Sequence, residues 1–228
     1  DLFWRRFEEV RRNVEHFSII GSTSDLGILG SEPLTLPDLF LRSVEEFNLP
    51  NALNYKREGE WRSISSAEFV DRAELVALGL HTLGLRKGDR AAILAANSPD
   101  WTLADAGCQF AGVIDVPIYT TLANDSIRYI ITDSGSRVFF LQDKATFERV
   151  REAVNGCSDL ARFVLFDSSD TDDERVISLS ELTAAGAQLR DESPGLAEEL
   201  RRALASSDIA TLIYTSGTTG EPKGVINT

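Results

Sequence analysis

Methionine is absent from the 228 residues, and cysteine occurs only twice, at Cys108 and Cys157. The missing initiator leads us to expect that position 1 is not the native start and that residues have been omitted. Two cysteines this far apart have no metal-ligand spacing and form no disulfide framework, which suits a reducing cytosol. We therefore predict a cytoplasmic protein with no metal site of its own in this chain.

Long apolar runs are also missing. No run approaches the roughly 18 residues of a membrane span, and the charged N-terminus lacks the apolar core of a signal peptide. Lys plus Arg total 23 against 36 Asp plus Glu, which gives a net charge of −13. Because an acidic surface repels nucleic-acid phosphates, we expect no nucleic-acid partner. The acidic stretch 167–174 lacks the glycine and the distal glutamate of a calcium loop, so we interpret it as a solvated turn.

The first 34 residues are predicted to form a segment of their own, a helix followed by a loop. Apolar side chains within residues 2–17 recur at helical spacing with arginines between them, which predicts an amphipathic helix. We favour a helix docked on the body of the protein. A peripheral contact with anionic lipid is the alternative, since amphipathicity alone does not separate the two. Glycine, proline and hydroxyl residues over 18–34 indicate the loop.

Residues 35–228 alternate between helical patterns and short apolar runs. Helices are expected at 36–47, 65–84, 98–112, 124–133, 144–154, 179–187 and 196–204. Strands are expected at 91–96, 113–118, 138–141, 163–166 and 209–214, after a hairpin over 52–64. Strands that are apolar throughout and alternate with helices predict an α/β fold, a doubly wound and mainly parallel sheet with flanking helices.

Capping residues mark the boundaries of two of these helices. Ser65, followed three residues later by Glu68, predicts a capping box. Ser98 precedes Pro99, which suits the first position of a helix. A glycine, Gly112, is expected to end that second helix.

The segment after the last predicted strand carries the chemistry. It reads TSGTTGEPKG over residues 215–224. Its glycines permit backbone conformations closed to other residues and allow close approach, and successive N–H groups in such a loop can form an anion-binding concavity. Four hydroxyl side chains add donors, Lys223 adds a positive charge, and Pro222 stiffens the exit. Every component suits several phosphate oxygens at once.

Other interpretations fit this segment less well. A Gly/Ser/Thr connector rarely combines four hydroxyls, a lysine and a buried strand leading in. The Walker pattern opens a helix directly after its lysine, whereas Val225 and Ile226 predict a strand here, and the dinucleotide pattern is absent. A nucleophile elbow would need glycine where Tyr214 stands. The two histidines, His16 and His81, lie inside helical patterns and are interpreted as surface or packing residues.

The sequence YTSGTTGEPKG at Tyr214–Gly224 resembles the phosphate-loop signature of the adenylate-forming superfamily. That superfamily includes acyl-CoA synthetases, luciferases and peptide-synthetase adenylation domains. Upstream, Leu36–Tyr55, Gly84–Trp101 and Ala111–Leu122 are similar to the start of a bacterial long-chain fatty acyl-CoA synthetase, and Val116–Tyr119 favours that subgroup.

The resemblance implies an acid–thiol ligase that uses ATP, Mg²⁺ and coenzyme A. A carboxylate, here a long-chain fatty acid, attacks the α-phosphorus of Mg-ATP to give an acyl-adenylate and pyrophosphate, and the thiol of coenzyme A then displaces AMP. The loop positions the β- and γ-phosphates and stabilises their charge, which Mg²⁺ shares. By this resemblance the phosphate contacts are Thr215, Ser216, Gly217, Thr218, Thr219, Gly220 and Lys223.

The chain departs from the superfamily pattern after the loop, where Asn227 and Thr228 stand in place of a Thr-His pair. In the superfamily the adenine and ribose contacts, the magnesium-holding glutamate, the catalytic lysine and most of the fatty-acid tunnel come later. We therefore expect an incomplete N-terminal α/β domain over residues 35–228, with no catalytic residue and no activity without the C-terminal remainder of the enzyme.

Two alternatives stay open at this point. The first remains within the superfamily: a ligase for aryl or short-chain acids, or an adenylation domain that loads a carrier-protein thiol. The second is a short, non-catalytic nucleotide-binding protein.

Overall fold

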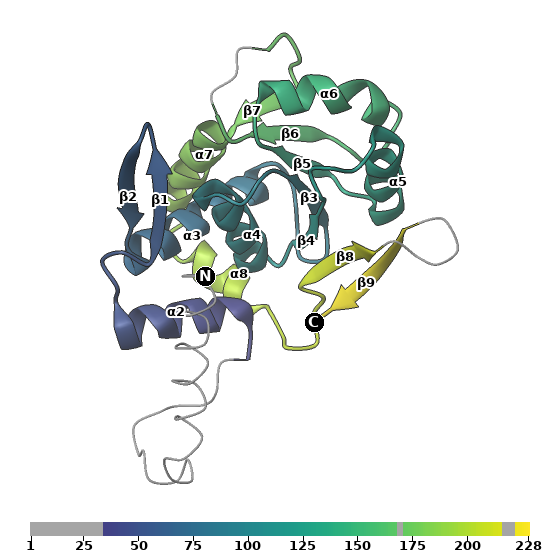
Figure 1. Ribbon diagram of the computed structural model, residues 1–228. Coiled ribbons are helices and arrows are strands. Elements are labelled where there is room, and N and C mark those ends of the chain that lie inside the picture. Colours follow the sequence, from purple (N-terminus) through teal and green to yellow (C-terminus); the bar gives the residue numbers. More distant parts are fainter. Residues whose placement is uncertain (1–33, 168–170, 216–221) are drawn as a thin grey trace, which may run out of the picture. The chain divides into compact units, whose positions relative to one another are not determined.

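The computed structural model describes residues 34–167, 171–215 and 222–228 (Figure 1). The predicted helix over residues 2–17 lies outside these ranges, as does the predicted loop over 18–34 except for its last residue. The helices are α2 (Leu36–Phe47), α3 (Ser66–Thr82), α4 (Pro99–Ala111), α5 (Asn124–Ser134), α6 (Lys144–Val154), α7 (Leu179–Glu192) and α8 (Leu196–Arg202). The strands are β1 (Leu53–Arg57), β2 (Glu60–Ile64), β3 (Arg90–Leu94), β4 (Ile114–Pro117), β5 (Val138–Leu141), β6 (Arg162–Leu165), β7 (Val176–Ser178), β8 (Thr211–Thr215) and β9 (Lys223–Asn227).

Capping residues set where the helices begin and end. The Ser98 side chain accepts a hydrogen bond from the N–H of Trp101 at 3.1 Å. Pro99 opens α4, and Gly112 ends it at a φ of 67°. At α3, Ser65 accepts from the N–H of Glu68, but the reciprocal half of the predicted box does not form there. The Glu68 carboxylate instead lies 3.6 Å from Arg72. The complete capping boxes are Thr35 with Asp38 and Ser178 with Glu181.

The seven-stranded sheet has the order β7-β6-β5-β3-β4-β8-β9, and β1 and β2 form a separate antiparallel hairpin. From β7 to β8 every neighbouring pair is parallel, and only β9 runs antiparallel, against β8. This arrangement confirms the predicted doubly wound α/β sheet. The three-residue strand β7 was not predicted, and α7 continues to Glu192, beyond its predicted end at 187.

Two apolar layers cover the two faces of the sheet. Because successive side chains of a strand point to opposite faces, Ala91 and Ile93 of β3 pack with α3, α4 and α7, whereas Ala92 and Leu94 pack with α5 and α6. All four side chains are fully buried. Strand β5 is apolar along its whole length, and β3 and β6 are apolar after their first residue, because helices cover both faces of the sheet there (Figure 1).

On one face, α3 and α7 approach each other closely enough to exclude side chains at their crossing. A Cβ atom added to Gly186 would overlap the carbonyl oxygen of Leu75, and one added to Gly79 would overlap the carbonyl oxygen of Leu182. The backbones of α3 and α7 lie so close together at Gly79 and Gly186 that only the hydrogen atoms of glycine fit between them. Glycine is therefore required at these positions by packing.

The β8–β9 hairpin occupies one end of the sheet, beyond β4 (Figure 1). It joins the parallel strands through a single ladder pair, Asp115 with Thr211. Every residue of β9 is exposed, and this strand forms the edge of the described sheet. The hairpin is therefore the least buried part of the sheet, and its free end carries the candidate phosphate loop.

Candidate functional site

The two ends of the candidate loop are held side by side by the β8–β9 hairpin. Thr215 is the last residue of β8, Lys223 is the first residue of β9, and the two are direct partners in the antiparallel register. Side chains of such cross-strand partners lie next to each other. Thr215 and Lys223 therefore place a hydroxyl-bearing and an ammonium-bearing side chain on opposite strands at the base of the loop.

The other predicted phosphate contacts lie outside the described residues. They are Ser216, Gly217, Thr218, Thr219 and Gly220. Lys223 is exposed, and it makes no hydrogen bond or ion pair with a residue that the structure describes. Its ammonium group is therefore an exposed positive charge at the base of the loop. Within the described ranges, the structure brings together the first and the last of the predicted contacts.

Tyr214, the residue before the loop, is anchored below the hairpin. Its side chain is only 7% exposed and packs in the apolar layer of α5. Its hydroxyl donates a hydrogen bond to Oδ2 of Asp133 on α5 at 2.6 Å. Burial, and then the contact with Asp133, raise the pKa of Tyr214 well above its ordinary value. The hydroxyl therefore stays protonated and remains a donor.

Sequence reasoning assigned Tyr214 no structural role and missed this contact. The available signal was an aromatic residue with a polar tip at the end of an apolar strand, since a buried tyrosine hydroxyl requires a partner. The sequence could not name that partner, because Asp133 lies 81 residues away.

Gly224 has a different role from the one that the loop composition suggested. It lies in β9 directly opposite Tyr214, and its backbone is not among those with a positive φ. A Cβ atom added there would lie 3.2 Å from Cζ of the Tyr214 ring. The missing side chain therefore makes room for the tyrosine ring.

A polar cluster fastens the opposite end of β8 to the core. Nε2 of Gln109 on α4 donates to Oδ1 of Asp115 at 3.0 Å and to the carbonyl oxygen of Ala210 at 3.3 Å. Oγ1 of Thr211 donates to the carbonyl oxygen of Asp115 at 3.2 Å. Burial, and then the neighbouring Asp105, raise the pKa of Asp115 to about 7. The base of the hairpin is thus held by a buried carboxyl group that is partly protonated near neutral pH.

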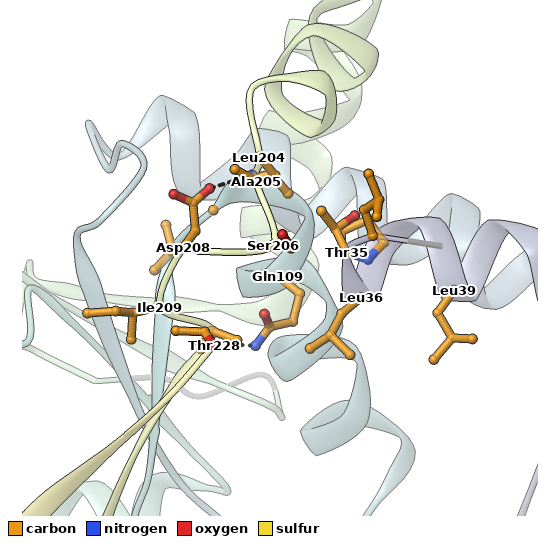
Figure 2. Close-up of a pocket in the computed structure, with 15 residues that line it drawn as sticks. Thr35, Leu36, Leu39, Gln109, Leu204, Ala205, Ser206, Asp208, Ile209 and Thr228 are labelled. Carbon is orange, nitrogen blue, oxygen red and sulfur yellow. Dashed lines mark hydrogen bonds between the residues drawn. The ribbon is translucent and has the colours of Figure 1, made fainter. Parts of the chain in front are cut away.

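The hollow in Figure 2 lies beside this cluster, and its lining includes neither Thr215 nor Lys223. It has a volume of about 350 Å³, and its walls include Leu36, Gln109, Ile209 and Thr228. Thr228 follows the last residue of β9, and the loop begins at the other end of that strand. Five strand residues span about 15 Å. The hollow is therefore separate from the loop base.

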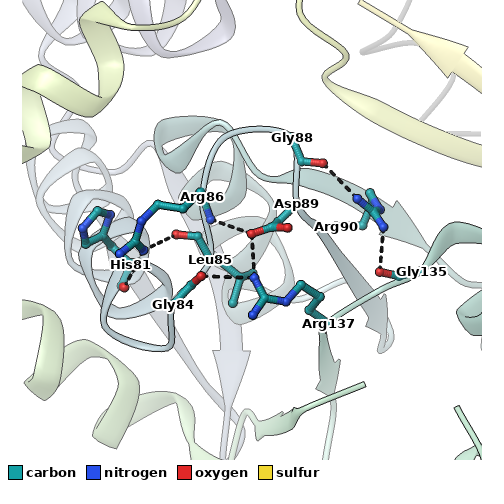
Figure 3. Close-up of polar contacts among 9 residues, drawn as sticks. All are labelled: His81, Gly84, Leu85, Arg86, Gly88, Asp89, Arg90, Gly135 and Arg137. Atoms are coloured by element: carbon teal, nitrogen blue, oxygen red, sulfur yellow. Dashed lines mark hydrogen bonds and ion pairs between the residues drawn. The ribbon is translucent and has the colours of Figure 1, made fainter. Parts of the chain in front are cut away.

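Arginines organise the loops at the amino ends of the parallel strands (Figure 3). Arg137 donates to Oδ2 of Asp89 at 2.8 Å and to the carbonyl oxygen of Gly84 at 3.1 Å. Arg90 donates from Nε to the carbonyl oxygen of Ser134 at 2.6 Å and from Nη2 to that of Gly135 at 3.0 Å. Arg90 thereby caps the C-terminus of α5, one residue beyond Asp133.

His81 lies in the last turn of α3, as its helical pattern predicts. Its pKa is lowered by burial and by Arg86. Among the described residues, no group of three or more His, Cys, Asp or Glu side chains is arranged to hold a metal ion. None of the helices described here has the length and apolar character to cross a membrane.

The comparison with known families decides what this scaffold is. Residues 41–228 match the family of AMP-binding enzymes. The chain belongs to this family. The sequence is 34% identical over 177 residues to a long-chain-fatty-acid–CoA ligase of Mycobacterium bovis. The aligned region covers 77% of this chain and 28% of that relative. It is 28% identical over 200 residues to a long-chain-fatty-acid–CoA ligase of Bos taurus, covering 87% of this chain and 27% of that enzyme.

The fold agrees with the solved structures of two ligases. An anthranilate CoA ligase in complex with anthranoyl-AMP matches with a TM-score of 0.67 and 22% identity, over 87% of this chain and 35% of that one. A fatty acyl-adenylate ligase from L. pneumophila in complex with acyl adenylate and pyrophosphate matches with a TM-score of 0.61 and 21% identity, over 84% of this chain and 30% of that one. The predicted partial domain of an adenylate-forming fold is thereby confirmed.

Proposed function

We propose that the full-length protein is an ATP-dependent acid–thiol ligase that converts a long-chain fatty acid to its acyl-adenylate and then to acyl-CoA. The observation that carries this proposal is the pairing of Thr215 with Lys223 at the base of a loop with the sequence SGTTGEP, within an AMP-binding enzyme scaffold. A strand pair that brings a hydroxyl and an ammonium group to the mouth of a glycine-rich loop suits a polyphosphate.

In the proposed first step, a carboxylate oxygen attacks the α-phosphorus of ATP, the bond to the bridging oxygen breaks, and pyrophosphate leaves. Thr215 and Lys223, with residues 216–220 between them, would hold the β- and γ-phosphates and stabilise the charge of the departing pyrophosphate. In the second step the sulfur of coenzyme A attacks the acyl carbonyl carbon and AMP leaves.

Magnesium enters the proposal as the partner of the ATP phosphates, whose negative charge it would share. The described residues offer no cluster of metal-binding side chains. No step is assigned to a magnesium ion held by this part of the chain. The adenine, ribose and acyl-chain contacts are likewise assigned to the portion of the enzyme beyond this chain, so we propose that residues 1–228 are inactive alone.

The preference for a long-chain acid comes from the two relatives reported above, both of which are named long-chain-fatty-acid–CoA ligases. The competing substrate class is an aryl acid, because an anthranilate ligase shares the fold. ATP–pyrophosphate exchange by the full-length protein distinguishes them, with long-chain, short-chain, aryl and amino acids supplied one at a time. Exchange with aryl or amino acids but not with fatty acids would contradict the long-chain assignment.

A non-catalytic nucleotide-binding protein is the alternative from another class. ATP binding without exchange for any acid would favour it. We place the enzyme in the cytoplasm, with residues 2–17 as the segment that would make any peripheral contact with anionic lipid. Deletion of that segment tests the contact, since a loss of vesicle co-sedimentation by a protein that still folds would support it.

A further inference from the structure

The loop end of the β8–β9 hairpin has few attachments to the rest of the described domain. The ladder pair of Asp115 with Thr211 lies at the opposite end of β8, four residues before Thr215. Val225 and Ile226 on β9 are 47% and 59% exposed. Near the loop, the side chain of Tyr214 is the buried part of the hairpin, and its hydroxyl forms the hydrogen bond to Asp133.

Asp133 is well suited to act as a fixed anchor. It belongs to the last turn of α5, whose apolar side chains Ile127, Ile130 and Ile131 are buried against the sheet. The carbonyl groups of Ser134 and Gly135, which follow it, accept hydrogen bonds from the Arg90 side chain of β3. Figure 3 shows the contact with Gly135. A continuous series of contacts thus runs from the central strand through the end of α5 to the carboxylate that receives the Tyr214 hydroxyl.

The geometry on the hairpin side is equally specific. Tyr214 points toward α5, so its neighbour Thr215, the last residue before the loop, points to the other face of the strand. Gly224 lies across from Tyr214 without a side chain, and a Cβ atom there would crowd the ring. Ring, hydroxyl and opposite glycine together fix the direction in which β8 delivers the chain into the loop.

We propose that Tyr214 and Asp133 are positioning residues for the phosphate loop, and that their hydrogen bond orients the loop for ATP. The inference rests on the proposed function for its kinetic consequence. Neither residue is assigned a contact with the substrate. The hydrogen bond holds the end of β8 against α5. It thereby sets the position of Thr215 and of its cross-strand partner Lys223 at the base of the loop.

The test uses the full-length enzyme and the variant Tyr214→Phe, which removes the hydroxyl and keeps the ring. We expect the KM for ATP in fatty-acid-dependent pyrophosphate exchange to rise by about tenfold, as for the loss of a hydrogen bond to a charged group, with the KM for the fatty acid unchanged. Asp133→Ala should act alike. Asp133→Asn, which keeps an acceptor oxygen, should recover most of the ATP affinity.

A double-variant cycle and a matched control separate positioning from general loss of structure. If the two residues act only through each other, Tyr214→Phe with Asp133→Ala should raise the KM for ATP no further than either change alone. Tyr55→Phe is the control, because Tyr55 lies on β1 in the separate hairpin. A merely structural loss would lower the active fraction and leave the KM for ATP unchanged.

Calorimetric titration of ATP without any acid keeps the inference independent of the proposed reaction. Weaker ATP binding by Tyr214→Phe than by the unaltered protein supports the inference even if no acid supports exchange, in which case only the ligase proposal fails. Equal ATP affinity and equal KM for ATP in both proteins would overturn the inference and leave the ligase proposal standing. A protein that neither binds ATP nor catalyses exchange would overturn both.

Discussion

The central parallel strands and the β8–β9 hairpin are stabilised in different ways. Strands β3, β5 and β6 are buried on both faces, and their side chains pack between two helical layers. In the hairpin, Ile213, Val225 and Ile226 are 37%, 47% and 59% exposed. The core is thus stabilised by distributed apolar burial, whereas the hairpin depends on a few polar contacts at its two ends.

This difference predicts two classes of substitution. Changes in the core should lower the free energy of unfolding and leave the handling of ATP by the folded protein unaltered. Changes at the exposed positions of the loop end, such as Lys223, should alter the handling of ATP with little effect on stability, because exposed side chains bury little apolar surface. A core substitution that altered the handling of ATP by the folded protein would contradict this distinction.

The largest effect is expected from Gly186→Ala in the core. The added methyl group would overlap the Leu75 carbonyl oxygen and lie 2.9 Å from the Gly79 nitrogen, and backbone atoms cannot rotate away. Overpacking of this kind costs about 3 kcal/mol of unfolding free energy, which urea unfolding would measure. Gly156→Ala is the control, because an added Cβ there meets nothing within 4 Å. Equal stability of the two variants would contradict the close α3–α7 crossing.

The second effect, Lys223→Ala, belongs to the loop end. Loss of the ammonium group should weaken stabilisation of the ATP phosphates by about 2 kcal/mol, as for a hydrogen bond to a charged group. Adenylation of the fatty acid by the full-length enzyme would then slow, whereas the unfolding free energy should hardly change because Lys223 is exposed. Lys56→Ala on β1 is a matched loss of one exposed charge. Unchanged kinetics of the adenylation step would show that Lys223 does not contribute to binding the ATP phosphates.

The contrast also explains what the sequence could and could not predict. The core follows from local signals: caps such as Ser98 and apolar runs such as 138–141 lie where helices and strands form. The strand β7 was missed because its three residues are too few to show a period. The contacts of the hairpin were missed for another reason. Gln109 meets Ala210 across 101 residues, a separation that no local pattern reports.

A third effect concerns the buried carboxyl group of Asp115, where the core meets the hairpin. Its folded pKa of about 7 lies above its ordinary value of 3.8, so the folded state binds more protons than the unfolded state between these values. Its contribution to stability is therefore largest at low pH and falls by about 1.4 kcal/mol per unit as pH rises through this window.

The variant Asp115→Asn removes that dependence. Between pH 5 and 6 the unfolding free energy of the unaltered protein should fall relative to that of the variant by about 1.4 kcal/mol. Urea unfolding at the two pH values would measure this difference. Parallel pH profiles for the two proteins would show that the carboxyl group is ionised in the folded state over the whole range.

The smallest effect tests whether the core and the hairpin are energetically separate. Ser98 caps α4, the helix that carries Gln109 to the base of β8. Ser98→Ala removes the acceptor for the N–H of Trp101 and should lower the unfolding free energy by about 1 kcal/mol. The KM for ATP should stay unchanged, because the cap lies at the opposite end of α4 from Gln109 and the loop is attached through Tyr214. An altered KM for ATP would mean that the core and the hairpin respond as one unit.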